Sequence, residues 1–269
     1  MKIRTFPSQV FLPLAILGIA LVAGLRAQAP ARGGQQQPPA QRVVVQVTHV
    51  KFDQVDAYQN LMKSTFLPVV KKANLAAYVW TWTSGASGEA GEFVQIRPIK
   101  NYAELDIPNR LRDAMGAEAL NAFNAKIRPM IASRQNYIQT VRQDLTLQAS
   151  AAPPALGVVQ IFQVSPGKGA DFTASMTSDY LPAFRKAGVK DFFAYAGNFG
   201  GAGGNIVTVR PIAKYAQLDE PGLLNKAGLS QDQIQKIGQR RAVTATVVEN
   251  NLVRFVPELS YGMPPKVAP

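Results

Sequence analysis

The sequence predicts an α+β protein built from two copies of one β-α-β-β-α-β unit. The first observation is a repeat: residues 93–106 return as residues 206–219, with Arg-Pro-Ile, Tyr-Ala and Leu-Asp at the same internal spacing. The second is that strand-like and helix-like segments flank the repeated motif in the same order in both copies. The third is that the chain has no cysteine, so a packed core must hold the fold together. A repeat of this length indicates two copies of a small domain, and not an array of short repeats.

Each copy contains the same elements in the same order. Runs of β-branched residues predict strands, and apolar residues three and four positions apart predict helices. The first copy is expected to have strands at 43–50, 77–83, 93–99 and 137–147 and helices at 52–73 and 117–134. The second is expected to have strands at 158–164, 192–196, 205–212 and 243–255 and helices at 170–187 and 231–241. A short helix is expected at each Tyr-Ala. Pro68 and Pro182 hold matching positions, so both first helices should kink or break there.

This order of elements is that of a ferredoxin-like unit, which is a four-stranded antiparallel sheet with its helices on one face. The other face of each sheet is left bare, and two units in one chain can cover it by packing sheet against sheet. On this unit order and on the repeated Arg-Pro-Ile-x-x-Tyr-Ala-x-Leu-Asp segment, the chain resembles the dimeric α/β-barrel superfamily, which includes antibiotic-biosynthesis-monooxygenase-like and NIPSNAP-like proteins. The resemblance implies two tandem ferredoxin-like (βαββαβ) repeats packed as an intramolecular dimeric α/β barrel.

The N-terminus has the order of a secretory signal peptide. Lys2 and Arg4 precede an apolar stretch at 10–24, and cleavage after Ala29 or Ala31 would follow small residues. The apolar stretch is short for a membrane span, so no stable span is expected after cleavage. The protein is therefore expected to be periplasmic or secreted. The expected boundaries are a signal peptide at 1–31, a flexible leader at 32–41, repeat 1 at 42–148, a linker at 149–155, repeat 2 at 156–256 and an irregular tail at 257–269.

Charge and composition exclude several classes of site. The formal net charge is +12, but the basic residues are dispersed and no aromatic ladder lies between them, so a nucleic-acid site is not expected. With a single histidine and no cysteine, the chain offers no histidine- or thiolate-based metal site. No oligomeric state follows from the sequence.

The repeated strands carry polar side chains that could line a ligand pocket. On the third strands, we expect Val94 and Ile96 to face the helices, and Gln95 and Arg97 to face the space between the sheets. Polar residues also occupy matching positions on the first strands and on the third strand of the second copy. The candidate ligand-binding residues of this set are Gln46, Gln95, Arg97, Gln160 and Arg210.

Arginine beside amides suits an acidic or carbonyl-bearing ligand, because the guanidinium group offers a fixed fork of donors. The alternative is that Arg97 pairs with Asp106 and Arg210 with Asp219, which would brace the turn after each strand.

Further candidates lie where the two copies differ. Trp80 and Trp82 alternate on one strand, where the second copy is expected to have Ala194 and Ala196. The tryptophans either wall a cavity or fill space. His49 is matched by Gln163 in the second copy, and a lone histidine can act as a general base or a haem ligand.

The favoured function is binding of a small, anionic or aromatic molecule in a pocket between the two sheets. No cofactor is predicted. The superfamily resemblance allows a second hypothesis, a cofactor-independent or haem-dependent oxygenase-like enzyme that would use His49, Trp80, Trp82 and Arg97. The third is a structural or interaction module whose barrel is filled by side chains.

Overall fold

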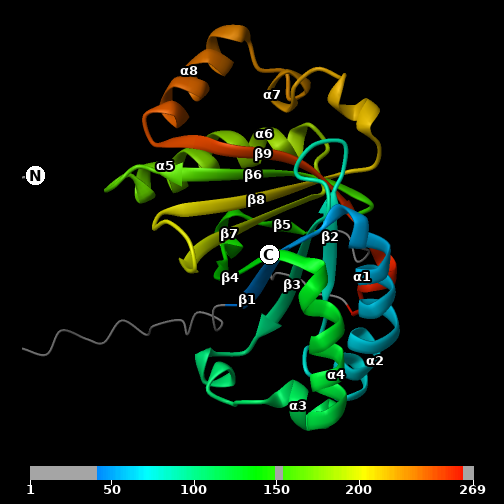
Figure 1. Ribbon diagram of the computed structural model, residues 1–269. Helices are drawn as coiled ribbons and strands as arrows, with labels where there is room; N and C mark the ends of the chain where they lie inside the picture. Colours follow the sequence, from blue (N-terminus) through cyan, green and yellow to red (C-terminus); the bar gives the residue numbers. More distant parts are fainter. Residues whose placement is uncertain (1–40, 149–153, 263–269) are drawn as a thin grey trace, which may run out of the picture. The chain divides into compact units, whose positions relative to one another are not determined.

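The computed structural model describes residues 41–148 and 154–262, here called the first and second halves. The predicted signal peptide, residues 32–40 of the leader, residues 149–153 of the linker and residues 263–269 of the tail lie outside the described residues. Figure 1 shows α1, α2 and α4 beside the strands of the first half, and α5, α6 and α8 beside those of the second.

The first half follows the expected order of elements. Its strands are β1 (Arg42–Val50), β2 (Trp80–Ser84), β3 (Glu92–Ile99), β4 (Ile131–Val141) and the short β5 (Leu147–Gln148). Its α-helices are α1 (Val55–Leu61), α2 (Leu67–Lys72), α3 (Arg110–Met115) and α4 (Ala117–Ile127). The sequence extended the last helix to residue 134, which is wrong, because Pro129 limits the helix to a short 3-10 turn and β4 begins at Ile131.

The second half repeats that order. Its strands are β6 (Leu156–Val164), β7 (Asp191–Phe199), β8 (Asn205–Ile212) and β9 (Ala245–Phe255). Its α-helices are α5 (Gly169–Ser175), α6 (Leu181–Lys186), α7 (Leu223–Lys226) and α8 (Gln231–Ala242). β7 is longer than the expected 192–196, because its end pairs with β4 of the first half.

The strands close into an eight-stranded antiparallel barrel. They pair in the order β4-β1-β3-β2-β9-β6-β8-β7, and β4 pairs with β7 to close the ring, while β5 adds to the outer edge of β7. Closure gives each of the eight barrel strands a hydrogen-bonded neighbour on both sides. This confirms the α+β class and the barrel.

Both expected helix breaks take the form of a π-helical turn. Met62–Phe66 and Met176–Tyr180 are π-helical, and each is followed by Leu-Pro at the start of the next α-helix. The backbone N–H of Leu67 donates to the carbonyl of Met62, and that of Leu181 to Met176. Because proline has no N–H to continue the α-helical pattern, the wider turn lets the helix continue past it.

Each half sends its tail into the core of the other half. Leu145 and Leu147, which follow β4, pack with Phe172 and Met176 of the second-half helices. Val256 and Leu259, which follow β9, pack in the corresponding core of the first half. Leu145 is 0% exposed and Leu259 is 2% exposed. Neither core is therefore complete without residues from the other half.

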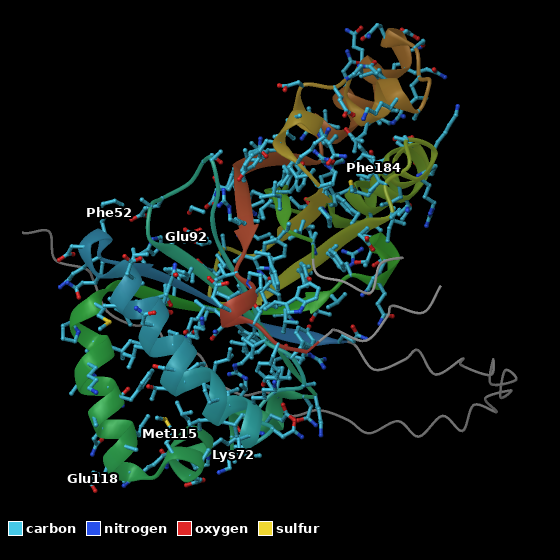
Figure 2. All side chains as sticks on the ribbon, turned by 90° about the vertical axis from the view of Figure 1, so that its right-hand side faces the viewer. Phe52, Lys72, Glu92, Met115, Glu118 and Phe184 are labelled. Carbon is cyan, nitrogen blue, oxygen red and sulfur yellow. The ribbon has the colours of Figure 1, made fainter. Side chains whose placement is uncertain are left out.

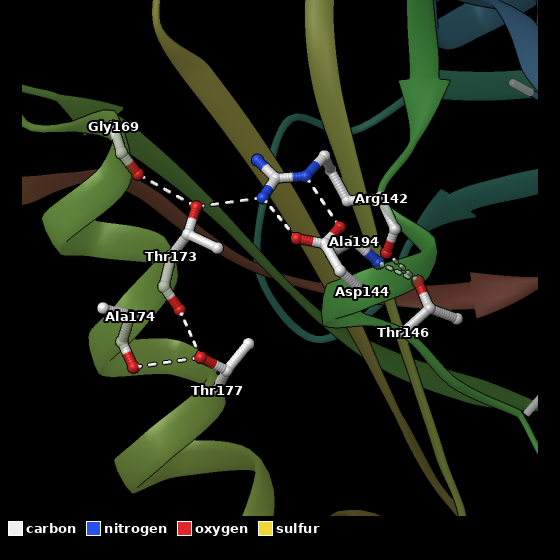
Figure 3. Close-up of polar contacts among 8 residues, drawn as sticks. All are labelled: Arg142, Asp144, Thr146, Gly169, Thr173, Ala174, Thr177 and Ala194. Carbon is white, nitrogen blue, oxygen red and sulfur yellow. Dashed lines mark hydrogen bonds and ion pairs between the residues drawn. The ribbon is translucent and has the colours of Figure 1, made fainter. Parts of the chain in front are cut away.

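Polar contacts fix the first of these tails, as Figure 3 shows. Arg142 donates to both carboxylate oxygens of Asp144, at 2.9 and 2.6 Å, and to Thr173 Oγ1 on α5 at 2.9 Å. The Arg142 guanidinium holds the pKa of Asp144 below its usual value. Thr146 Oγ1 donates to the Arg142 carbonyl and accepts from the N–H of Ala194 on β7. The tail thus joins a second-half helix to a second-half strand.

The repeated tyrosines also join the halves. Tyr102 accepts a hydrogen bond from Asn198 at the end of β7 at 3.0 Å, and its ring packs edge-to-face on Phe199. Its counterpart Tyr215 lies so close to Gly85 that a Cβ there would stand 2.6 Å from the tyrosine hydroxyl. The Tyr-Ala repeat therefore places one tyrosine from each half against the hairpin of the other.

Candidate functional site

The predicted faces of the third strands are reversed in the structure. Phe93 packs with Tyr58 and Met62 of the helices, whereas Val94 and Ile96 pack with Trp80 and Trp82 inside the barrel. Side chains alternate along a strand, so Gln95 and Arg97 lie on the helix side of the sheet. The prediction failed because both faces of β3 carry apolar side chains, one packed on helices and the other inside the barrel, and the sequence pattern does not show which face is which.

The second half shows the same reversal. Ile206 packs with Phe172 and Met176 of the helices, so Thr208 and Arg210 lie on the helix side as well. Gln160 pairs directly with Thr208 and shares that face. The expected placement of all five Gln and Arg candidates between the sheets is therefore wrong. The candidates of each half nevertheless share one face of their sheet.

A polar row crosses the helix side of the first half. Gln46 on β1 is the register partner of Gln95 on β3 and of Asn136 on β4, and Gln95 is the partner of Thr81 on β2. Gln46 donates to Asn136 Oδ1 at 3.0 Å, and Gln95 donates to Thr81 Oγ1 at 3.5 Å. Four neighbouring strands thus place amide and hydroxyl groups in one line on the helix side of the sheet.

Arg97 lies beside this row, two positions from Gln95 on the same face. Within residues 41–148 and 154–262 its guanidinium makes no hydrogen bond and no ion pair, and the expected pairs with Asp106 and, for Arg210, with Asp219 do not form. Burial lowers the pKa of Arg97, and the nearby Arg110 lowers it further against the opposing effect of Glu104. Burial also lowers the pKa of Arg210.

Positive charge is concentrated around Arg97 more than around Arg210. Arg42 lies on the same face of the neighbouring strand, where its partner is Ile99, and its guanidinium stands 4.8 Å from the ring centroid of Tyr102. The second half has Leu156 opposite Ile212 at the corresponding place. Sequence reasoning missed Arg42. The signal was available, because the matching residue in the second copy is Leu156, so the two copies differ in charge there.

The tryptophans fill the barrel. Trp80 and Trp82 are 6% and 4% exposed, and both pack edge-to-face on Phe255, at 6.0 and 5.3 Å between centroids. The indole N–H of Trp80 donates to the carbonyl of Gly262 at 3.1 Å. These contacts are those of core side chains with satisfied polar groups.

The expected counterparts of the tryptophans are wrong by one residue. Trp80 pairs with Ile96, and the matching position Val209 pairs with Phe193, so Phe193 and not Ala194 corresponds to Trp80. By the same register, Tyr195 corresponds to Trp82. Ala194 lies on the helix side, in the core of the second half. Both halves therefore supply aromatic side chains to the barrel.

His49 lies at one end of the barrel among carboxylates. Its Nδ1 is 3.0 Å from Glu89 Oε2, and its Nε2 is 3.8 Å from Glu92 Oε2. Glu92, the first residue of β3, is labelled in Figure 2. Burial raises the pKa of Glu92; His49 opposes this rise, while Glu249 and Glu89 add to it.

Other polar groups gather at the same end. β1 and β6 are separated by four antiparallel pairings, so they run parallel, and Gln163 ends at the same rim as His49. Gln163 donates to the Gly203 carbonyl at 2.7 Å. Burial raises the pKa of Tyr137, and Glu249 and Glu92 raise it further. Sequence reasoning missed Glu89, Glu92, Glu249 and Tyr137, because loop and strand ends distant along the chain meet only in the closed barrel.

Two kinds of feature are absent from the described part of the chain. It contains no group of three or more His, Cys, Asp and Glu side chains that could hold a metal ion. None of its helices is both long and apolar enough to cross a membrane.

Solved structures share this architecture. A proposed monooxygenase from Lactobacillus acidophilus matches 83% of this chain and 98% of its own, with 7% identity and a TM-score of 0.51. A proposed monooxygenase from Fusobacterium nucleatum matches 81% and 94%, with 12% identity and a TM-score of 0.54. An anthrone oxidase-like protein matches 82% and 92%, with 12% identity and a TM-score of 0.53.

No family model and no curated protein matches the sequence. At these identities the likeness extends to the fold alone. The structural neighbours are monooxygenase-like proteins of the dimeric α/β-barrel type, so the closed α+β barrel that the sequence resemblance implied is confirmed.

Proposed function

We propose that this protein binds a small organic anion on the helix side of the first-half sheet, with Arg97 as the anchoring cation. One observation carries the proposal: Arg97 is a partly buried guanidinium without a protein partner in the described residues, beside a row of amides. A partly buried charge without a partner costs free energy, and a carboxylate or phenolate would remove that cost while using the amides for orientation. The proposed site therefore lies on the helix side of the first-half sheet, and not between the sheets as the sequence predicted.

An oxygenase-like reaction has weaker support. Its expected participants lie in three places: His49 at the barrel end, Trp80 and Trp82 inside the barrel, and Arg97 on the opposite face of the sheet. Reacting groups must converge within a few ångströms of one substrate atom, which these do not. His49 also fits poorly as a haem ligand, because both ring nitrogens face carboxylates and the nearby charges would repel haem propionates.

We also propose that the barrel consists of two ferredoxin-like repeats. The strand orders β4-β1-β3-β2 and β9-β6-β8-β7 support this, because both reduce to the same order of fourth, first, third and second strand within a half. The segments after β4 and β9 each complete the core of the other half, which supports the proposal that the two repeats fold as one unit.

The binding proposal predicts a specific loss in Arg97→Met. Salicylate is the probe, with uncharged salicylamide as its matched analogue and isothermal titration calorimetry as the measurement. Because a charge-assisted hydrogen bond contributes about 1.5–3 kcal/mol, the Kd of salicylate should rise about 10- to 100-fold. Arg112→Met, at an exposed position on α3, makes the same change in net charge and should leave the Kd unchanged. Equal Kd values in the two variants, or equal affinity for salicylamide, would contradict the proposal.

We further propose that the protein is exported, on the support of its charged, apolar and small-residue N-terminal order. Expressed with its N-terminus intact in a bacterial host, the protein should be recovered outside the cytoplasm. Intact-mass measurement should give a mature N-terminus after Ala29 or Ala31. A product that keeps Met1 and stays in the cytoplasm would contradict export.

A further inference from the structure

A groove of about 360 Å³ lies on the second half, away from Arg97 and from the barrel. Its walls come from the π-helical turn and α6 on one side and from α7 and α8 on the other. Its apolar lining includes Ala183, Ala227 and Ile237, and its charged lining consists of Asp179, Lys186, Lys236 and Arg240. The volume lies within the range of small-molecule sites.

α8, which forms one wall of the groove, is poor in apolar residues. In the first half, α4 places Phe123 against Phe66, with ring centroids 6.0 Å apart, and Leu120 and Ile127 join the same core. Ile234 and Ile237 are the large apolar residues of α8, and the remaining positions are mostly Gln, Lys and Arg. α8 therefore offers its neighbouring helices fewer large apolar side chains than α4 does.

The floor of the groove is apolar and fixed. Ala227 is 1% exposed, and Ala183 and Ile237 are buried beside it. These side chains lie on three different helices, α6, α8 and the end of α7. They offer an alkyl chain a surface that is already dehydrated on one side.

The single acid among the lining residues is already neutralised. Asp179 accepts from Arg240 Nε at 3.1 Å, and Arg240 Nη2 stands 2.9 Å from the same oxygen. Ser175 also donates to Asp179 at 3.2 Å. The Asp179–Arg240 pair links the π-helical turn to α8 and leaves the two lysines to set the charge of the rim.

The lysines leave the rim positive. Lys186 makes no hydrogen bond and no ion pair with any residue that the structure describes. Lys236 pairs with Asp232 one turn away at 2.8 Å, but both side chains are more than 60% exposed, so that pair is weak and exchangeable. Both ammonium groups are therefore available to an incoming carboxylate.

We propose that this groove binds an amphipathic carboxylate, such as a medium-chain fatty acid. Its alkyl chain lies on Ala183, Ala227 and Ile237, and its carboxylate lies between Lys186 and Lys236. This site is separate from the one around Arg97, and it takes a ligand with a longer apolar chain.

Calorimetric titration with octanoate tests the proposal on the whole chain. Because octanoate is a monovalent anion at neutral pH, the double variant Lys186→Met/Lys236→Met should raise its Kd about 10-fold. The matched control is Lys126→Met/Lys190→Met, which removes two exposed lysines outside the groove and should keep the wild-type Kd. Butyrate should bind about 100-fold more weakly than octanoate, because it has four fewer CH₂ groups to bury.

Three results would overturn the proposal: no octanoate binding by the wild type, equal Kd values in the two double variants, or binding of 1-octanol as tight as that of octanoate. Arg97→Met separates this site from the other one. It should leave octanoate binding intact, and loss of octanoate binding in that variant would assign the ligand to Arg97 instead.

Discussion

Replacing Leu259 with alanine is expected to lower the free energy of unfolding by about 2–5 kcal/mol, the range for a buried leucine truncated to alanine. Leu259 follows the last barrel strand, yet it packs in the first-half core with Val50, Tyr58 and Phe123. The substitution should therefore destabilise the first-half core, although Leu259 follows the last strand of the second half. Urea denaturation followed by circular dichroism measures the loss of stability.

Leu145→Ala should produce a loss of similar size through the second-half core. The matched control is Leu218→Ala, because Leu218 is 41% exposed and its truncation should change stability by no more than about 0.5 kcal/mol. A Leu259→Ala variant as stable as Leu218→Ala would show that the tails do not complete the two cores.

The second large effect is expected for Trp82→Ala, which should cost about 3–5 kcal/mol of stability. Trp82 packs on Phe255 and Val94 inside the barrel, so its removal leaves a cavity between strands of both halves. Trp82→Phe should recover most of the loss because a ring still fills the space. Unfolding curves measure both variants.

Trp82→Ala also distinguishes two hypotheses: a barrel filled by side chains, and a barrel that holds the ligand. Its Kd for salicylate should equal that of the wild type, because the proposed site lies on the other face of the sheet. A variant that keeps its stability and loses salicylate binding would return the ligand to the space between the sheets.

The order of elements could be predicted from the sequence because each strand and helix pattern occurs in both copies. Arg-Pro-Ile marks the end of β3 and of β8, and each Leu-Pro marks the α-helix that follows a π-helical turn. The direct pairing of Gln46 with Gln95 also follows from the unit order, which makes the first and third strands neighbours.

The faces of the strands could not be predicted in the same way. Helices cover one side of β3 and the barrel covers the other, so Phe93 and Val94 are both apolar and either could face inward. The counterpart of Trp80 was wrong for a related reason. Phe192 and Phe193 are both aromatic, and only the register with β8 shows which one faces the barrel.

The most direct test of the account is a crystal structure of the protein with salicylate bound. We expect a salicylate carboxylate within hydrogen-bonding distance of the Arg97 guanidinium, on the helix side of the first-half sheet and beside Gln46 and Gln95. Salicylate inside the barrel against Trp80 and Trp82, with Arg97 unchanged, would contradict it.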